Sequence, residues 1–245
     1  MPRLHLAALL TAGTLVLACT ACSGTPGTPA PAAAGTTSSA VSTPPAAPAL
    51  DAAKVGSAIT DAAKQASAVH VKGTIAQEGS TMNVDLQLNP DSANGTIVKD
   101  GLEIPVLRVG DKYYVRFTSS LVKQAGVPAS AAKQLTGKWV SSTAKIGAGL
   151  GEAFKEFLDY KGFTNGILGE LEKSTFTSGE PTTLAGMPAL SFKSVDGTAT
   201  VAAAEPHYLL RMADPKHGAM EFSDWNKPTT INTPAASEIY SGPGA

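Results

Sequence analysis

Cys19 and Cys22 are the only cysteines in this chain of 245 residues, and two residues separate them. Three kinds of chemistry use cysteines at this spacing: a redox-active pair, half of a zinc site, or an attachment point for a lipid beside an unrelated cysteine. A zinc site needs a second pair of Cys or His ligands at a similar spacing, and the sequence has none. The residues around the two cysteines must therefore decide between a redox pair and a lipid attachment point.

The residues before Cys22 have the order of a secretory signal. Arg3 gives a basic start, and an apolar run follows over residues 4–18. This run is shorter than the about 20 residues that a membrane-spanning helix needs. The sequence Thr20-Ala21-Cys22-Ser23-Gly24 then resembles a bacterial lipobox, in which a small residue precedes a cysteine whose sulfur receives a diacylglycerol.

Cys22 is the preferred attachment site, and Cys19 is the alternative. Leu17 is bulky for its place before Cys19, whereas small residues precede Cys22. Cleavage before Cys22 would remove residues 1–21 as a signal peptide and Cys19 with them, which excludes a redox pair in the mature chain. We expect a covalent diacylglycerol and acyl (palmitate) modification of Cys22, and anchoring on the outer face of the cell membrane. The alternative is a plain secreted protein whose cysteines are incidental.

Residues 22–50 are expected to be a lipidated cysteine followed by a disordered tether. Positions 23–50 carry no charged and no aromatic residue, and Ala, Pro, Thr, Ser and Gly dominate. Such a segment cannot bury enough apolar area to offset the entropy of ordering it. We interpret it as a spacer between the membrane and a domain.

The composition changes at Asp51, and residues 51–240 have the length of a single domain. Residues 241–245 are expected to be a flexible tail. The formal net charge of −1 provides no basic surface, so nucleic acid is not an expected partner. Because no cysteine follows Cys22, the domain must be held together by its hydrophobic core.

Alternating apolar residues predict strands that bury one face. In residues 81–89, Met82, Val84, Leu86 and Leu88 alternate with polar residues. Further strands are expected over 69–75, 95–100, 102–109 and 111–117, and then over about 173–178, 188–194, 197–203, 206–212 and 218–223. Turns are expected at Asn94-Gly95, Asp100-Gly101, Gly110-Asp111 and Asp196-Gly197.

Helices are predicted before and between these two groups of strands. Asp51 can cap a helix that runs to about residue 67, and further helices are expected over 119–135 and 145–171. The links between strands mostly have hairpin length, which argues against parallel βαβ units. The predicted class is α+β, with one large antiparallel sheet and helices packed on one of its faces.

Several stretches of the chain resemble the LprG/LppX family of actinobacterial lipoproteins, whose fold is similar to that of the LolA/LolB carriers. Besides the lipobox and its spacer, they are SAVHVKGTI after the opening helix, LRVGDKYYVRF at 107–117 and FSDWNKPTTINTP at 222–234. The resemblance covers most of residues 51–240. It implies a curved half-barrel sheet with helices over its concave face, an apolar cavity between them, and carriage of acylated lipids.

The candidate residues for this cavity come from the alternating strands and from an apolar helical stripe. The sheet candidates are Met82, Val84, Leu86, Tyr113, Val115 and Phe117, and the helical candidates, which would form a lid, are Leu150, Phe154, Phe157 and Leu158. The alternative is that all ten are ordinary residues of a filled core.

The sequence contains none of the short catalytic motifs that we sought, such as G-x-S-x-G, H-E-x-x-H or a P-loop. His70, His207 and His217 are each expected at the surface, without a metal partner. We therefore expect no enzyme, no metal and no cofactor besides the covalent lipid. The first hypothesis is a membrane-anchored carrier of lipid or lipid-linked glycan that works with an envelope export machinery. The second is a non-enzymatic interaction or sensor module with a filled core and a protein partner.

Overall fold

The structure is a computed structural model that describes residues 50–77 and 79–245. The predicted signal peptide, Cys19, Cys22 and the tether up to residue 49 lie outside the described residues.

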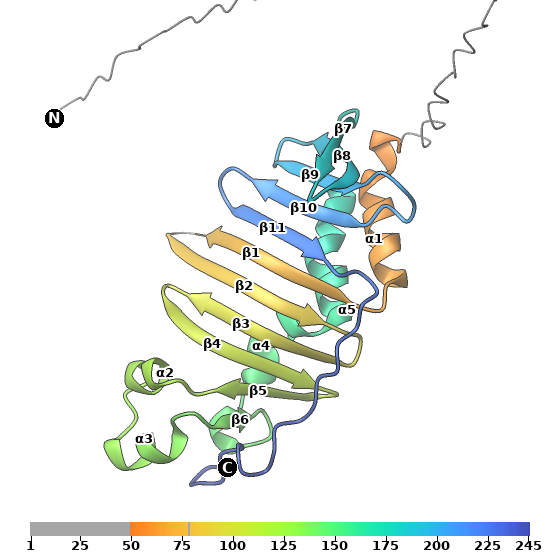
Figure 1. Cartoon of the computed structure of the whole chain (residues 1–245). Coiled ribbons are helices and arrows are strands. Elements are labelled where there is room, and N and C mark those ends of the chain that lie inside the picture. Colours follow the sequence, from red (N-terminus) through yellow and green to blue (C-terminus); the bar gives the residue numbers. More distant parts are fainter. Residues whose placement is uncertain (1–49, 78) are drawn as a thin grey trace, which may run out of the picture. The chain divides into compact units, whose positions relative to one another are not determined.

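Eleven strands form one antiparallel sheet whose two edges are β6 and β7 (Figure 1). Their order is β6-β5-β4-β3-β2-β1-β11-β10-β9-β8-β7, so each half of the chain forms a meander and the first and last strands pair in the middle. The bounds are β1 Val69–Gln77, β2 Ser80–Leu88, β3 Ser92–Lys99, β4 Leu102–Val109, β5 Lys112–Arg116, β6 Trp139–Ser141, β7 Glu180–Leu184, β8 Met187–Lys193, β9 Thr198–Ala202, β10 Leu209–Asp214 and β11 Gly218–Ser223. The predicted α+β class with one large antiparallel sheet is confirmed.

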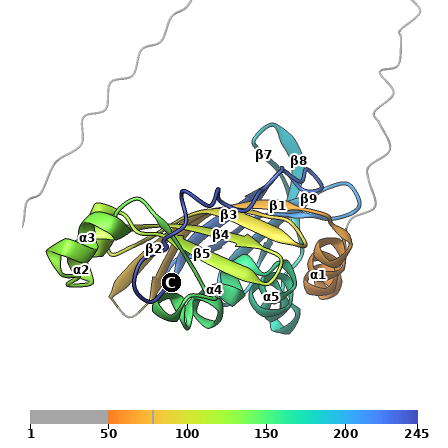
Figure 2. The same cartoon turned by 90° about the horizontal axis from the view of Figure 1, so that it is seen from below.

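The helices α1, α4 and α5 lie on the same face of the sheet, which we call the inner face (Figure 2). The helical segment between β6 and β7 consists of α4 Leu150–Leu158, α5 Tyr160–Phe163, the π-helical turn η3 Thr164–Leu168 and the 3-10 helix η4 Gly169–Lys173. The other elements are η1 Ala52–Lys54, α1 Val55–Gln65, α2 Ser119–Gln124, α3 Ala129–Leu135 and η2 Lys145–Gly147. The side chain of Asp51 accepts a hydrogen bond from the Ala53 N–H at the start of η1, so the predicted cap is present.

The inner face is apolar because side chains alternate along each strand. In β2, Val84, Leu86 and Leu88 are all buried against the helices, as their spacing predicts. Gly73 also faces inward, at a point where neighbouring strands approach closely. A Cβ at Gly73 would lie 2.2 Å from the Ala219 carbonyl oxygen, which only glycine tolerates.

Residues 224–245 run from β11 along the ends of the strands to the edge strand β6 (Figure 1). The Asn226 N–H donates to the Ala68 carbonyl oxygen over 3.0 Å, and the Trp139 N–H donates to the Glu238 carbonyl oxygen over 2.8 Å. The C-terminal segment is therefore fixed at both ends of its course.

The strand predicted over about 173–178 is wrong. Residues 174–179 form no strand, and the edge strand is β7 instead. Phe176 is buried, and the Thr177 N–H donates to the Lys193 carbonyl oxygen over 2.8 Å, so this stretch connects the helical segment to the sheet. Pro181 weakens the strand signal in β7, but an edge strand accepts proline because one of its sides needs no ladder hydrogen bond.

The turn predicted at Asn94-Gly95 is also wrong, because both residues lie inside β3. The connection from β2 to β3 is at residues 89–91, where Pro90 cannot continue the ladder. A Cβ at Gly95 would lie 2.0 Å from the Asp85 carbonyl oxygen, so this glycine serves close strand contact and not a turn. The other three predicted turns connect adjacent strands, and the short strand β6 was not predicted.

Candidate functional site

A groove lies between the helical segment and the inner face of the sheet. Its larger part, with a volume of about 800 Å³, lies between η3–η4 and the strands β9 and β10. Its smaller part, with a volume of about 370 Å³, lies between α4–η3 and the strands β1, β2, β10 and β11. Both parts are lined by Ile167, Met212, Asp214 and His217, so they adjoin. We call the two parts together the groove.

The floor of the groove consists of apolar side chains on neighbouring strands. Ile75 pairs with Met82 across β1 and β2, and Met212 pairs with Met220 across β10 and β11. The facing wall carries Phe157, Ile167, Leu171 and Phe176. Three of the five methionines of the chain thus lie in this floor. Because methionine is unbranched and adapts its shape, such a floor suits an apolar ligand of irregular form.

Asp214 and His217 form a polar pair where the two parts of the groove meet. The Asp214 Oδ2 lies 2.5 Å from the His217 Nδ1, and the Lys216 N–H donates to the Asp214 Oδ1 over 2.7 Å. The hydrogen bond with His217, helped by the backbone N–H groups, holds the pKa of Asp214 below its usual range. This residue is therefore a carboxylate at neutral pH.

Four further charged residues border the groove. Glu156 lines its smaller part, and Glu170, Lys173 and Asp196 line its larger part. The Lys173 Nζ lies 2.7 Å from the Glu170 Oε1. The rim therefore carries four carboxylates and one lysine beside His217.

The structure separates the ten candidate cavity residues into three groups. Met82 and Phe157 line the groove. Val84, Leu86, Tyr113, Val115 and Leu158 are buried in the core, and Phe117, Leu150 and Phe154 are half-buried and pack against that core. Their assignment to a lipid cavity stays a prediction.

Most of the groove residues were not among the sequence candidates. Met212 and Met220 belong to the second meander, and only the pairing of β1 with β11 brings them beside Ile75 and Met82. Ile167 projects from a π-helical turn, whose wider spacing of residues a search for helical stripes does not detect. The strands predicted over about 206–212 and 218–223 contain the two methionines, and this was the one signal that could have pointed to them.

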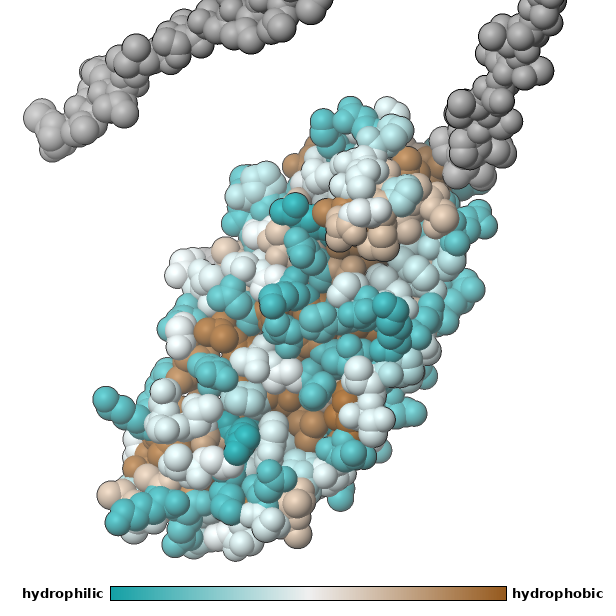
Figure 3. Space-filling model, in the orientation of Figure 1, coloured by the Kyte–Doolittle hydropathy of each residue, from teal (hydrophilic) through white to brown (hydrophobic). Residues whose placement is uncertain are grey.

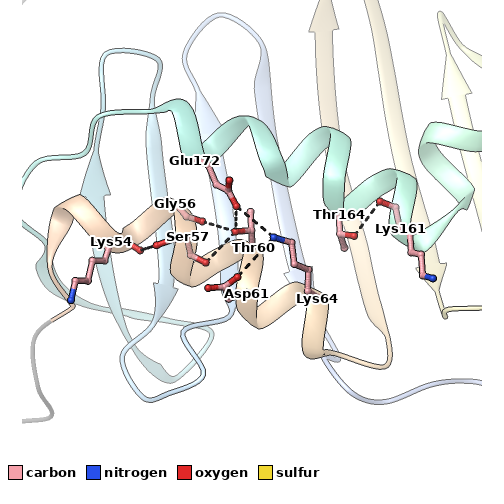
Figure 4. A network of polar contacts seen from close by, with 9 residues as sticks. All are labelled: Lys54, Gly56, Ser57, Thr60, Asp61, Lys64, Lys161, Thr164 and Glu172. Atoms are coloured by element: carbon pink, nitrogen blue, oxygen red, sulfur yellow. Dashed lines mark hydrogen bonds and ion pairs between the residues drawn. The ribbon is translucent and has the colours of Figure 1, made fainter.

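The wall of the groove is fixed to α1 by polar contacts (Figure 4). The Thr60 Oγ1 donates to the Glu172 Oε1, and the Lys64 Nζ lies 3.7 Å from the same oxygen. A second contact joins α1 to α5, where the Tyr160 hydroxyl donates to the Ala63 carbonyl oxygen over 2.7 Å. These contacts hold η4 and α5 in place while the side facing β9 and β10 stays open.

Three polar side chains on the outer face form a row that resembles a Ser-His-Asp triad. The Ser223 Oγ lies 3.3 Å from the His70 Nδ1, and the His70 Nε2 lies 2.7 Å from the Asp85 Oδ1. Their strands are interior strands paired on both sides, so the ladder uses the backbone N–H groups that an oxyanion hole would need. Asp85 also pairs with Lys72, 2.9 Å away. We interpret the row as a set of polar contacts between neighbouring strands on the outer face. On the surface that Figure 3 shows, hydrophilic residues surround separate hydrophobic patches.

The surface position predicted for His207 is wrong. This residue belongs to the loop between β9 and β10; it is buried, and its Nδ1 lies 3.0 Å from the Ala202 carbonyl oxygen. Within residues 50–77 and 79–245, no group of three or more His, Cys, Asp and Glu side chains could hold a metal ion. None of the helices in this part of the chain has the length and apolar character to span a membrane.

Comparison with known proteins finds similarity in structure only. No family model and no curated protein matches the sequence. The fold is similar to that of the Mycobacterium tuberculosis lipoprotein LppX. The TM-score is 0.45 at 16% sequence identity, over 72% of this chain and 95% of LppX. A putative outer membrane lipoprotein-sorting protein domain from Vibrio parahaemolyticus matches with a TM-score of 0.23 at 13% identity, over 74% of this chain and 95% of that domain. LppX is one of the two proteins that name the family the sequence resembles.

Proposed function

We propose that this protein is an extracytoplasmic lipoprotein that binds a lipid or lipid-linked glycan in the groove and carries it. The groove itself supports the proposal, because an apolar floor and an apolar wall face each other across an open space. The two volumes, about 800 and 370 Å³, are of the size of known small-molecule sites, about 300–1,000 Å³.

A lipid needs such a surface when it leaves a bilayer. Each CH₂ group exposed to water costs about 0.8 kcal/mol, so a palmitoyl chain would cost roughly 12 kcal/mol. Contact with Ile75, Met212 and Ile167 replaces water along the chain. The groove opens beside the hairpin ends of β8–β9 and β10–β11, so a ligand can enter without breaking the ladder between strands.

The membrane anchor is the second part of the proposal. A diacylglycerol on Cys22 would hold the protein on the outer face of the cell membrane, and residues 23–50 would allow the domain to reach lipid beside it. An envelope export machinery is the partner class that would receive the ligand.

The experiment tests for bound lipid. The full chain, with Cys19→Ser and Cys22→Ser to exclude covalent lipid, is purified from an actinobacterial host and extracted with organic solvent for mass spectrometry. We expect stoichiometric acylated lipid. Met212→Trp fills the floor of the groove and should remove the lipid. Met187→Trp is the matched control, because Met187 is 46% exposed and lies outside the groove, and it should retain the lipid. A lipid-free parent, or equal retention by both variants, contradicts the proposal.

One observation favours the second hypothesis, an interaction module with a protein partner. The core between α4 and the strands β2 and β5 is filled, since Val84, Leu86, Val115 and Leu158 are all buried. This function predicts that crosslinking in cells recovers one protein partner and that the purified chain carries no lipid.

A further inference from the structure

We propose that the groove selects its ligand by the charge of the polar head: it accepts an uncharged or cationic head and disfavours an anionic one. This inference rests on the proposed function of the groove as a lipid site. It concerns the rim of the groove, whereas the proposed function concerns its apolar floor.

The carboxylates of the rim are spread over the whole length of the groove. Glu156 lies on α4 beside the smaller part, Asp196 lies in the turn from β8 to β9 beside the larger part, and Asp214 lines both parts. A polar head at either end, or at the middle, therefore meets a negative charge.

The cationic groups of the rim are already engaged by acids. The Lys173 Nζ lies 2.7 Å from the Glu170 Oε1, and the His217 Nδ1 lies 2.5 Å from the Asp214 Oδ2. Glu156 and Asp196, by contrast, have no ion-pair partner among residues 50–77 and 79–245. Among the described residues that line the groove, a phosphate or carboxylate head would thus meet carboxylates and no lysine or histidine that lacks an acidic partner.

The apolar surroundings strengthen this repulsion, and solvent limits it. Charges beside a low-dielectric wall interact more strongly than charges in bulk water, and repulsion of the wrong partner is a general source of specificity. Glu156 and Asp196 are exposed, however, so salt screens them. We expect discrimination of about two- to fivefold at low ionic strength, which falls as salt is added.

The test compares three ligands that share one palmitoyl chain. Monopalmitoylglycerol is uncharged, palmitoylcholine is cationic and palmitoyl-lysophosphatidylglycerol is anionic. Each displaces the uncharged dye Nile red from the full chain carrying Cys19→Ser and Cys22→Ser, below the concentration at which the ligand forms micelles. The double variant Glu156→Gln/Asp196→Asn removes two rim charges with little change of shape. Glu103→Gln/Asp111→Asn removes two exposed carboxylates outside the groove and is the matched control.

The expected result is that the anionic ligand binds several-fold more weakly than the other two. Glu156→Gln/Asp196→Asn should reduce this difference in affinity, while Glu103→Gln/Asp111→Asn should leave the difference unchanged. Equal binding of all three ligands, or an identical difference in the rim variant, overturns the inference and leaves the proposed function standing. If none of the three ligands displaces the dye, the proposed function fails and this inference fails with it.

Discussion

The Arg108 Nη2 lies 3.1 Å from the Asp159 Oδ2, and this ion pair joins the sheet to the junction between α4 and α5. Arg108 faces inward from β4 with a side chain that is 8% exposed, and its Nη1 donates to the Pro90 carbonyl oxygen over 3.1 Å. Asp159 also caps α5 by accepting from the Gly162 N–H over 2.7 Å. The pair thus fixes the junction between α4 and α5 to the sheet, just before the part of the helical segment that lines the groove.

Asp159→Ala should strongly destabilise the fold. The substitution leaves the buried guanidinium of Arg108 without its counter-ion, and the Nε of Arg108 already has no partner among the described residues. Loss of one partner of a buried pair costs about 3–5 kcal/mol. Urea denaturation measures the free energy of unfolding. Asp61→Ala is the control, because the exposed pair between Asp61 and Lys64, 3.9 Å apart, should contribute only about 0–1 kcal/mol. An equal decrease in the free energy of unfolding of the two variants would contradict this account of the ion pair.

Gly56→Ala should loosen the contact between α1 and η4. A Cβ at Gly56 would lie 2.4 Å from the Leu171 carbonyl oxygen, so the two helices would have to separate at a cost of about 1–3 kcal/mol. Gly151→Ala in α4 is the matched control. Its Cβ would lie 3.5 Å from the Tyr113 Cδ2, an ordinary contact, and alanine favours a helix by up to about 1 kcal/mol over glycine. Thermal denaturation should therefore show a lower Tm for Gly56→Ala and not for Gly151→Ala. An equal decrease of the Tm in both variants would contradict the close contact at Gly56.

Tyr160 should make stability fall at alkaline pH. Burial, with a smaller contribution from Tyr208, raises the pKa of Tyr160 from 10.0 to about 12. The folded state therefore holds the phenolic proton more tightly than the unfolded chain. The resulting stability is complete below pH 10 and is lost as pH rises from 10 toward about 12.

The measurement is the free energy of unfolding as a function of pH, for the parent and for Tyr160→Phe. The parent should lose stability more steeply over this range, because the variant has no phenol to titrate. Parallel curves would mean that the phenol of Tyr160 titrates alike in the folded and unfolded chains.

The sequence predicted most strands because period-two alternation reports which face is buried, whatever that face packs against. The alternation did not locate the groove, because the path of the helical segment decides which residues of the buried face are covered by helices and which line the groove. Met82 and Val84 are neighbours on the same side of β2, yet Met82 lines the groove and Val84 is buried in the core. Likewise, Met212 and Met220 join this floor only through the pairing of β1 with β11, which is a contact between the two ends of the domain.

Cys22→Ser should release the protein from membranes into the soluble fraction, because the lipobox predicts that its sulfur carries the diacylglycerol. Cys19→Ser should leave the protein in the membrane fraction, since this residue is expected to be removed with residues 1–21. Fractionation of cells followed by immunoblotting distinguishes the two variants. Release by Cys19→Ser alone would assign the lipid to the alternative cysteine.

The most direct test of the central claim is to locate a bound acyl chain by photo-crosslinking. The full chain with Cys19→Ser and Cys22→Ser is incubated with monopalmitoylglycerol that carries a diazirine in its chain, irradiated, digested and sequenced by mass spectrometry. The account predicts that label concentrates at Ile75, Met82, Phe157, Ile167 and Met212, and that excess unlabelled monopalmitoylglycerol competes it away. Label on the outer face, for example at Val98, or label that does not respond to competition, would contradict the claim that the groove is the lipid site.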